Sequence, residues 1–161
     1  MRVSQKITPC LWFDGNAEAA VNHYVSTFKN SKIVEVMRHP KGGRAQEGSV
    51  LTITFQLHGS QEFTALNGGP DFKFTEALSL MVNCDTQAEV DELWSKLSAG
   101  GSEQPCGWLK DKFGLSWQIV PVRFLEMMHD KDAERVRRTF EAMLTMKKLD
   151  LARLERAYQG A

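Results

Sequence analysis

The sequence predicts an α+β protein built from two tandem β-α-β-β-β units followed by a helical tail. A strand, a polar turn and an amphipathic helix occur near the start of the chain and recur further on, with short strand patterns after each helix. Sliding the chain along itself by 71 residues aligns Asp14 with Asp85 and Ala17 with Ala88, so the two helices superpose. Identity between the copies is slight, and the repeat therefore depends on the order of elements and on the hydrophobic pattern.

The first unit spans about residues 5–70. Ile7 to Phe13 is apolar and β-prone, and Pro9 favours an edge position because proline cannot donate to a strand ladder. The polar turn at residues 14–16 starts a helix over residues 17–28, whose apolar side chains repeat at helical spacing. Further strands are expected over residues 32–38, 49–57 and 62–66.

The second unit spans about residues 75–122 and repeats this order. A strand over residues 77–83 leads to Asp85-Thr86, which caps a helix over residues 87–98, and Gly100-Gly101 ends that helix. A short strand is expected over residues 102–105. Residues 107–110 and 115–120 then form a hairpin turned by Asp111 to Gly114.

The helical tail spans residues 129–161 and belongs to neither copy. Asp132 caps a first helix, and a second helix is expected over residues 151–158. Basic and acidic side chains nearly balance along the tail, which favours a solvated face over a nucleic-acid interface. We therefore expect residues 1–128 to form one domain of two units, with the tail as an extension.

Composition excludes several classes of partner. The 161 residues are 42% hydrophobic and 25% charged, as in folded globular proteins, and twenty basic residues offset twenty acidic ones. A net charge of zero gives no global field to hold nucleic acid or an anionic membrane. There is no apolar run of membrane-spanning length and no signal-peptide pattern. Three cysteines without a C-x-x-C pair indicate reduced thiols, so we expect a cytoplasmic protein.

Four segments carry a family resemblance, and together they cover essentially the whole chain: residues 8–18, 63–70, 107–121 and 146–150. They resemble PhnB-like proteins, a branch of the vicinal-oxygen-chelate superfamily of glyoxalase I, bleomycin-resistance proteins and extradiol dioxygenases. The resemblance implies that the strands of both units form a curled mixed sheet around a cup, with the helices outside. It also implies a homodimer, with or without swapping of units between subunits.

Many PhnB-like proteins carry the label 3-demethylubiquinone-9 3-methyltransferase, and the residues argue against that activity here. A Rossmann-type methyltransferase needs a strand, a glycine-rich turn and a helix within a parallel sheet. In this chain Gly68-Gly69-Pro70 is followed by a strand, and Gly100-Gly101 follows a helix instead of preceding one. No cofactor is expected.

The ligand set of the metal-dependent relatives is missing. The resemblance places ligand positions at Ile7 or Thr8, at Thr64 or a neighbour, at Ala77 or Leu78, and at Gln118. Of these, only Gln118 is a strong candidate donor, and one amide oxygen among aliphatic groups cannot hold a transition metal. We therefore expect no metal.

A pocket for a small molecule is the remaining site hypothesis. Aromatic walls with a few convergent polar groups suit such a site, although the aromatic residues fit a core or a dimer interface equally well. The Asn67-Gly68-Gly69 loop is read first as a tight turn and second as a ligand contact. The candidate cup-lining residues are Phe13, Thr64, Asn67, Ser79, Trp108, Lys110, Asp111, Phe113 and Gln118.

Two functional hypotheses follow. The first is a metal-independent protein that binds a small molecule, similar in logic to bleomycin-resistance proteins. The second is a glyoxalase- or dioxygenase-like enzyme acting on a small metabolite, with a metal or with acid–base residues such as Lys110 and Asp111. The missing ligand set favours the first hypothesis, the polar segment around Lys110 keeps the second open, and neither names the ligand.

Overall fold

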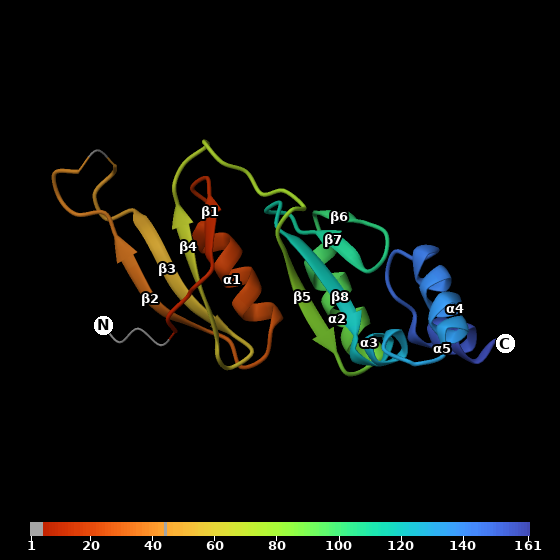
Figure 1. The fold of residues 1–161 in the computed structure, drawn as a ribbon. Coiled ribbons are helices and arrows are strands. Elements are labelled where there is room, and N and C mark those ends of the chain that lie inside the picture. Colours follow the sequence, from red (N-terminus) through yellow and green to blue (C-terminus); the bar gives the residue numbers. More distant parts are fainter. Residues whose placement is uncertain (1–4, 44) are drawn as a thin grey trace. The chain divides into compact units, whose positions relative to one another are not determined.

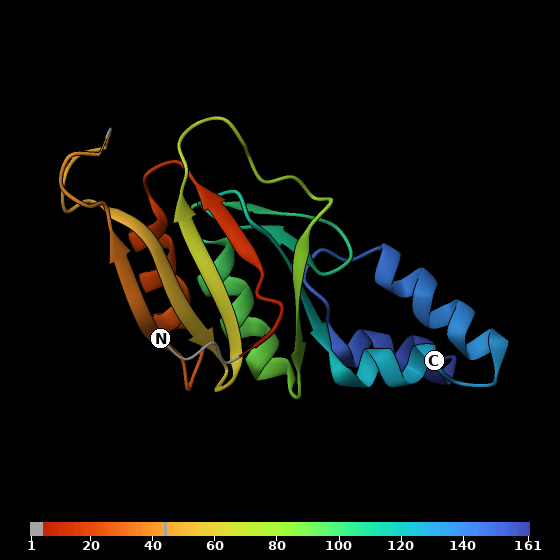
Figure 2. The same cartoon turned by 60° about the vertical axis from the view of Figure 1, so that its left-hand side comes forward.

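The computed structural model describes residues 5–43 and 45–161. The chain divides after Lys73 into two compact units, each with its own four-stranded sheet (Figures 1 and 2). Both sheets are open and mixed, and each has a helix after its first strand. The α+β class and the repeated β-α-β-β-β order predicted from the sequence are therefore confirmed.

In the first unit, one helix and four strands follow the expected order. The sheet order is β1-β4-β3-β2, in which β1 runs parallel to β4 and the other neighbours are antiparallel. This order leaves β1 at an edge, as Pro9 predicts. The elements are β1 (Cys10–Phe13), α1 (Ala17–Thr27), β2 (Lys32–Arg38), β3 (Val50–Leu57) and β4 (Gln61–Asn67).

The core of the first unit lies between the sheet and α1, which packs on β3 and β4 and is seen behind the sheet in Figure 2. Strand alternation turns one set of side chains toward the helix. Phe55 and Phe63 of adjacent strands stack with ring centroids 5.4 Å apart, and Tyr24 of α1 lies 6.4 Å from Phe55. Burying large apolar side chains in this way is the main favourable contribution to folding.

The second unit repeats this topology with one much shorter edge strand. The sheet order is β5-β8-β7-β6, and β5 runs parallel to β8 as β1 does to β4. The counterpart of the seven-residue β2 is the two-residue β6. The elements are β5 (Ser79–Cys84), α2 (Gln87–Ser98), β6 (Ser102–Glu103), β7 (Trp108–Lys110) and β8 (Ser116–Pro121).

Several boundaries differ from the sequence predictions, most of them by one or two residues. Strand β1 begins at Cys10 because Pro9 has no N–H, and Pro9 only accepts a hydrogen bond from Thr64 N at 2.9 Å. Strand β5 begins at Ser79, two residues later than predicted. Helix α3 (Val122–Met128) was not predicted, because its apolar residues continue the apolar run of β8 without a polar turn between them.

The tail consists of α4 (Ala133–Leu144) and α5 (Leu151–Gln159), which follow α3. Asp132 and Asp150 cap α4 and α5 as N-cap residues, Asp132 as the sequence predicts. Backbone hydrogen bonds of 2.8 Å join Cys106 N to the Met146 carbonyl and Gly107 N to the Lys147 carbonyl. The tail packs around one buried group, the tail cluster, formed by Val120, Phe124, Met127, Met143, Met146, Leu149, Leu154 and Tyr158.

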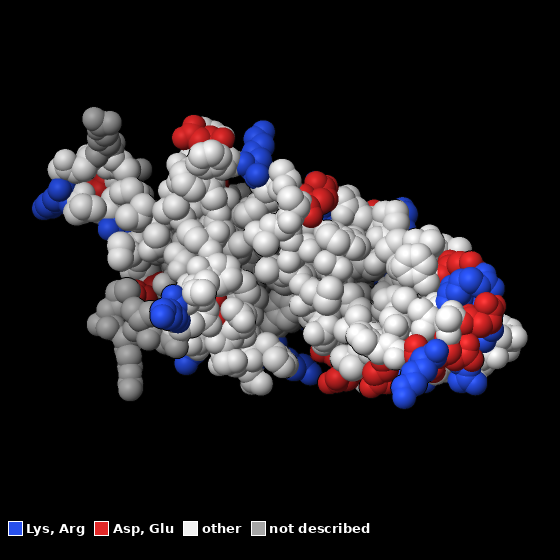
Figure 3. All heavy atoms as spheres, viewed as in Figure 1, with Lys and Arg blue, Asp and Glu red and all other residues white. Residues whose placement is uncertain are grey.

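Charges of both signs alternate over the outer surface of the tail (Figure 3). On α4, Arg137 pairs with Glu134 at 2.5 Å and with Glu141 at 2.6 Å. Such exposed pairs contribute little to stability, and each places opposite charges side by side on the surface of α4. Among the residues that the structure describes, no helix is long and apolar enough to cross a membrane.

Candidate functional site

The β7–β8 hairpin divides its side chains between two environments. Leu109, Trp117 and Ile119 are buried toward α2, which packs on both strands. Strand alternation turns the intervening side chains to the opposite face. We call that side the open face of the second sheet; it carries Ser79, Met81, Trp108, Lys110, Ser116 and Gln118.

Four of the predicted site residues share this open face: Ser79, Trp108, Lys110 and Gln118. The strand register sets Met81, Gln118 and Trp108 side by side across β5, β8 and β7. The Gln118 amide donates a hydrogen bond of 2.9 Å to Ser79 Oγ. An amide fixed in this way beside an indole and a methionine thioether combines one polar anchor with apolar walls.

Lys110 brings a charge to the open face. Its Nζ lies 2.5 Å from a carboxylate oxygen of Glu76, which also accepts a 3.4 Å hydrogen bond from Gln104 Nε2. The hydrogen bond from Lys110 is the main cause that lowers the pKa of Glu76, followed by the backbone N–H of Glu76 and by Gln104. The open face therefore presents an ammonium that is already paired with a carboxylate of the same unit.

Ser116 lies between these groups and was not among the predicted site residues. Its hydroxyl is fully buried and has no hydrogen-bond partner among the described residues. Buried polar groups are nearly always hydrogen-bonded, so an exception calls for an explanation, such as a bound ion, a water molecule or a functional role. The sequence signal was its spacing of two residues from Gln118, which places both on one face of a strand.

Asp111 and Phe113 lie in the hairpin turn and not on the open face. The Asp111 carboxylate is buried and accepts hydrogen bonds from Phe113 N at 2.8 Å, Leu115 N at 3.1 Å and Trp117 Nε1 at 2.9 Å. A carboxylate with three donors holds the hairpin closed and orients Trp117. The ring of Phe113 lies 5.3 Å from Lys112 Nζ.

In the first unit, two predicted site residues face α1. Phe13 is part of the buried core. The Asn67 amide oxygen accepts a hydrogen bond of 3.0 Å from Ala17 N, and its nitrogen donates 3.1 Å to the Val50 carbonyl. Asn67 therefore supplies the cap that Asn16, the N-cap residue of α1, does not provide. Thr64 lies on the opposite face of the sheet, beside Cys10 and Thr54.

The Gly68-Gly69 loop is held by Trp12. The indole N–H of Trp12 donates 2.9 Å to the Gly69 carbonyl, and its ring meets Phe72 edge-on at 4.8 Å. A Cβ atom on Gly68 would lie 2.3 Å from the Trp12 ring, closer than side-chain atoms approach. Glycine at this position is therefore required by close packing as well as by the turn.

The positions that hold metal in the superfamily do not fit a transition metal here. Thr64 pairs with Cys10, and Gln118 pairs with Met81, which lies 71 residues after Cys10, so the two are equivalent in their units. Hydroxyls and one amide are weak donors beside the imidazoles, thiolates and carboxylates that zinc, iron or nickel require. In residues 5–43 and 45–161, no three His, Cys, Asp or Glu side chains gather as a metal site.

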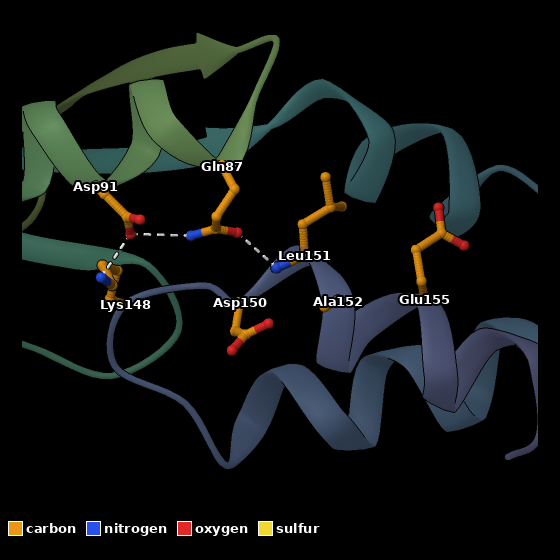
Figure 4. Close-up of a pocket in the computed structure, with 7 residues that line it drawn as sticks. All are labelled: Gln87, Asp91, Lys148, Asp150, Leu151, Ala152 and Glu155. Carbon is orange, nitrogen blue, oxygen red and sulfur yellow. Dashed lines mark hydrogen bonds and ion pairs between the residues drawn. The ribbon is translucent and has the colours of Figure 1, made fainter.

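A groove of about 410 Å³ separates α2 from the start of α5 (Figure 4). Gln87 crosses it, accepting 2.7 Å from Leu151 N and donating 3.1 Å to the Leu149 carbonyl. Lys148 lies 2.5 Å from the Asp91 carboxylate. These contacts attach the tail to α2, and the polar groups that line the groove are already paired within the unit.

The comparisons with known proteins agree with this architecture. A family model described as 3-demethylubiquinone-9 3-methyltransferase matches residues 5–120, more than half of the chain. The chain belongs to this family. A solved structure described as the PhnB protein of Bacillus cereus is 40% identical to the chain, with a TM-score of 0.67. The match covers 73% of this chain and 99% of that one. The predicted membership of the PhnB-like family is confirmed.

More distant structures share the fold alone. The protein PA1353 of Pseudomonas aeruginosa is 22% identical, with a TM-score of 0.63, and the match covers 73% of this chain and 98% of that one. The fosfomycin resistance protein FosX of Mesorhizobium loti is 8% identical, with a TM-score of 0.51 and coverage of 74% and 92%. A comparison with curated proteins finds no match.

Proposed function

We propose that this PhnB-like protein binds a small molecule on the open face of the second sheet without a metal ion. The observation that carries the proposal is the Gln118 amide, held by Ser79 and set between Trp108 and Met81. A preoriented amide gives directional recognition, and the flanking apolar side chains give contact area. The residues at the superfamily's metal positions, Thr64 and Gln118, offer only neutral oxygen donors, which supports binding without a metal ion.

The second candidate is an enzyme acting on a small metabolite, and the Lys110–Glu76 pair favours it. An ammonium and a carboxylate 2.5 Å apart can transfer a proton to or from a bound molecule. Asp111, the other acid–base candidate, is already engaged by three donors of its own hairpin. The family's methyltransferase label gains no support from the sheets, since neither described sheet has the parallel order of a nucleotide-binding fold.

The proposal includes a cytoplasmic homodimer whose strands form a cup. Apolar side chains on strand β2 and on α4 remain exposed, among them Val34, Met37 and Leu144, at 48%, 47% and 53% exposure. Exposed apolar edges and stripes favour association. A shared interface between two copies would cover such surfaces.

A fragment screen followed by NMR tests the binding site. We expect small polar-aromatic fragments to shift the backbone signals of Ser79, Met81 and Gln118 and the Gln118 side-chain amide. Gln118→Ala and Trp108→Ala should each abolish or greatly weaken these shifts. Gln87→Ala, which alters the groove between α2 and α5, is the matched control and should leave them unchanged. Fragments that bind only at that groove would refute the proposed site.

Metal analysis tests the metal-independent part and separates the two candidates. Protein purified without chelator should contain far less than one transition metal ion per chain, and fragment binding should be the same before and after EDTA treatment. Near-stoichiometric metal whose removal abolishes fragment binding would replace the proposal with the metal-dependent enzyme.

A further inference from the structure

One lateral row of the second sheet is composed of hydrogen-bond donors. Cross-strand pairing aligns Ser79 with Ser116, Ser116 with Lys110, and Lys110 with Ser102. The row therefore crosses β5, β8, β7 and β6 and contributes three hydroxyls and one ammonium. Side chains directly opposite each other on adjacent strands have Cβ atoms about 5 Å apart, which lets neighbouring members contact one small group together.

The centre of the row is incomplete. The Ser116 hydroxyl is fully buried and makes no hydrogen bond to any described residue, whereas Ser79 accepts from Gln118. Ser116 lies between the hydroxyl of Ser79 and the ammonium of Lys110 in the pairing. Because Ser116 has no exposed surface, an acceptor reaches its hydroxyl only when the side chains over the row move aside, and it would then also gain the charge of Lys110.

A carboxylate of the same unit already pairs with the ammonium that the row contributes. Glu76, from the segment before β5, pairs with Lys110 at 2.5 Å and accepts from Gln104 at 3.4 Å. The Glu76 side chain is 50% exposed, so solvent reaches it, and exposed ion pairs are weak. The surroundings of Lys110 therefore accommodate a carboxylate and hold this one loosely.

We propose that the row binds the oxyanion of the ligand, a carboxylate or phosphonate, and that Glu76 is an internal competitor which this oxyanion displaces. The inference rests on the proposed function and names the chemical class of the ligand's head group. Gln118, Trp108 and Met81 in the adjacent row would then contact the rest of the molecule. The Lys110 side chain must turn from Glu76 toward the row, which its flexible stem allows.

Titration with simple oxyanions tests the inference. Acetate and methylphosphonate are added to the wild-type protein and to Glu76→Gln at constant ionic strength, with the backbone signals of Ser79 and Ser116 as readout. Acetamide is the neutral control ligand. We expect at least one of the two anions to bind, and Glu76→Gln to tighten that binding about fivefold, as removal of a weak competing pair should do. Acetamide should cause no saturable shift.

Two further variants separate a binding row from a structural one. In the Glu76→Gln background, Ser116→Ala and Lys110→Met should each weaken anion binding several-fold. Ser116→Ala should leave the unfolding midpoint unchanged or raise it, because it removes an unpaired hydroxyl. Glu92→Gln is the matched control, since Glu92 is exposed to the same extent as Glu76 and pairs with Lys96 at 2.6 Å, and it should not change anion binding.

The oxyanion row and the proposed small-molecule site can fail separately in these experiments. Equal anion affinities in wild type and Glu76→Gln, or full affinity after Ser116→Ala, would overturn the oxyanion row and reduce Lys110–Glu76 to a tether of the segment before β5. Neutral fragments could still bind beside Gln118 in that case, and the proposed function would stand. The absence of both fragment and anion binding on this face would reject both.

Discussion

Trp117 and Gln118 are adjacent in sequence and have opposite roles, because successive side chains of a strand face opposite ways. Trp117 is buried and donates to Asp111, whereas Gln118 donates to Ser79 on the open face. Trp117→Ala should lower the free energy of unfolding by about 3–5 kcal/mol, since it empties a large buried site and leaves Asp111 without one donor. Urea denaturation measures this loss.

Gln118→Ala should lower the free energy of unfolding by less than about 1 kcal/mol, because it removes one partly solvated hydrogen bond. Trp108→Ala, in the same hairpin but half-buried, is the control for truncating an indole. A larger loss for Gln118→Ala than for Trp117→Ala would mean that the two faces of β8 have been assigned in reverse.

Cys84 should react more slowly with alkylating reagents than the exposed Cys10. Burial raises the pKa of the Cys84 thiol to about 12 from 9.0, and the charges of Glu89 and Asp85 add to the shift. Alkylation at pH 8 should modify the exposed Cys10 before Cys84, which peptide mapping over time would measure. Faster labelling of Cys84 in the folded protein would contradict this.

The same shift sets a pH dependence of stability. Well below pH 9.0 the thiol is protonated in both states, so its ionisation does not affect stability there. Between pH 9.0 and about 12 the unfolded thiol ionises first, and stability falls. Cys84→Val should remove this part of the alkaline decline in urea-unfolding measurements, and an identical decline in the variant would count against it.

At the scale of elements, the sequence predicts bounds best where residues that start and stop the element stand next to it. Helix α2 has the predicted bounds because Thr86 accepts from Glu89 N at one end and a glycine pair follows the other. Helix α3 was missed because no turn residues separate it from β8. The extended segment before each first strand was also read as strand, although hydrogen bonding begins later.

The candidate site was predictable only in part. Alternation along β8 places Gln118 and Ser116 together from sequence alone. The role of Asn67 depends on partners that are distant in sequence, and the role of Asp111 depends on backbone groups of a turn. The periodicity of apolar residues carries no information about either kind of partner. A polar residue at the end of a strand suggests a ligand contact. Here Asn67 instead bonds the N-terminus of α1, and Asp111 bonds the backbone of its own hairpin.

Asn67 joins two elements of the first unit, and its loss should destabilise both. Asn67→Ala should lower the free energy of unfolding by about 1–3 kcal/mol, since it removes the cap of α1 and leaves the Val50 carbonyl without a side-chain donor. Thermal unfolding followed by circular dichroism measures it. Asn16→Ala is the control and should have a smaller effect, because Asn16 makes no side-chain capping bond.

At the scale of the whole molecule, we expect a homodimer. Apolar side chains remain exposed on β2 and on α4, where they include Phe140 and Leu144. A partner subunit would cover such surface. Light scattering at micromolar concentration should give twice the 18.2 kDa mass of the chain. A mass of 18.2 kDa across the same concentrations would rule the dimer out.

The hydrogen bonds between the residues just before β7 and the tail also impose an order on folding during synthesis. A chain leaving the ribosome can complete its first sheet once Asn67 has emerged, because every strand of that sheet precedes it. The second unit must wait for Met146 and Lys147, whose carbonyls receive Cys106 and Gly107. Until then the apolar side chains of α3 stay uncovered, so chaperones and proteases should act on the nascent protein there.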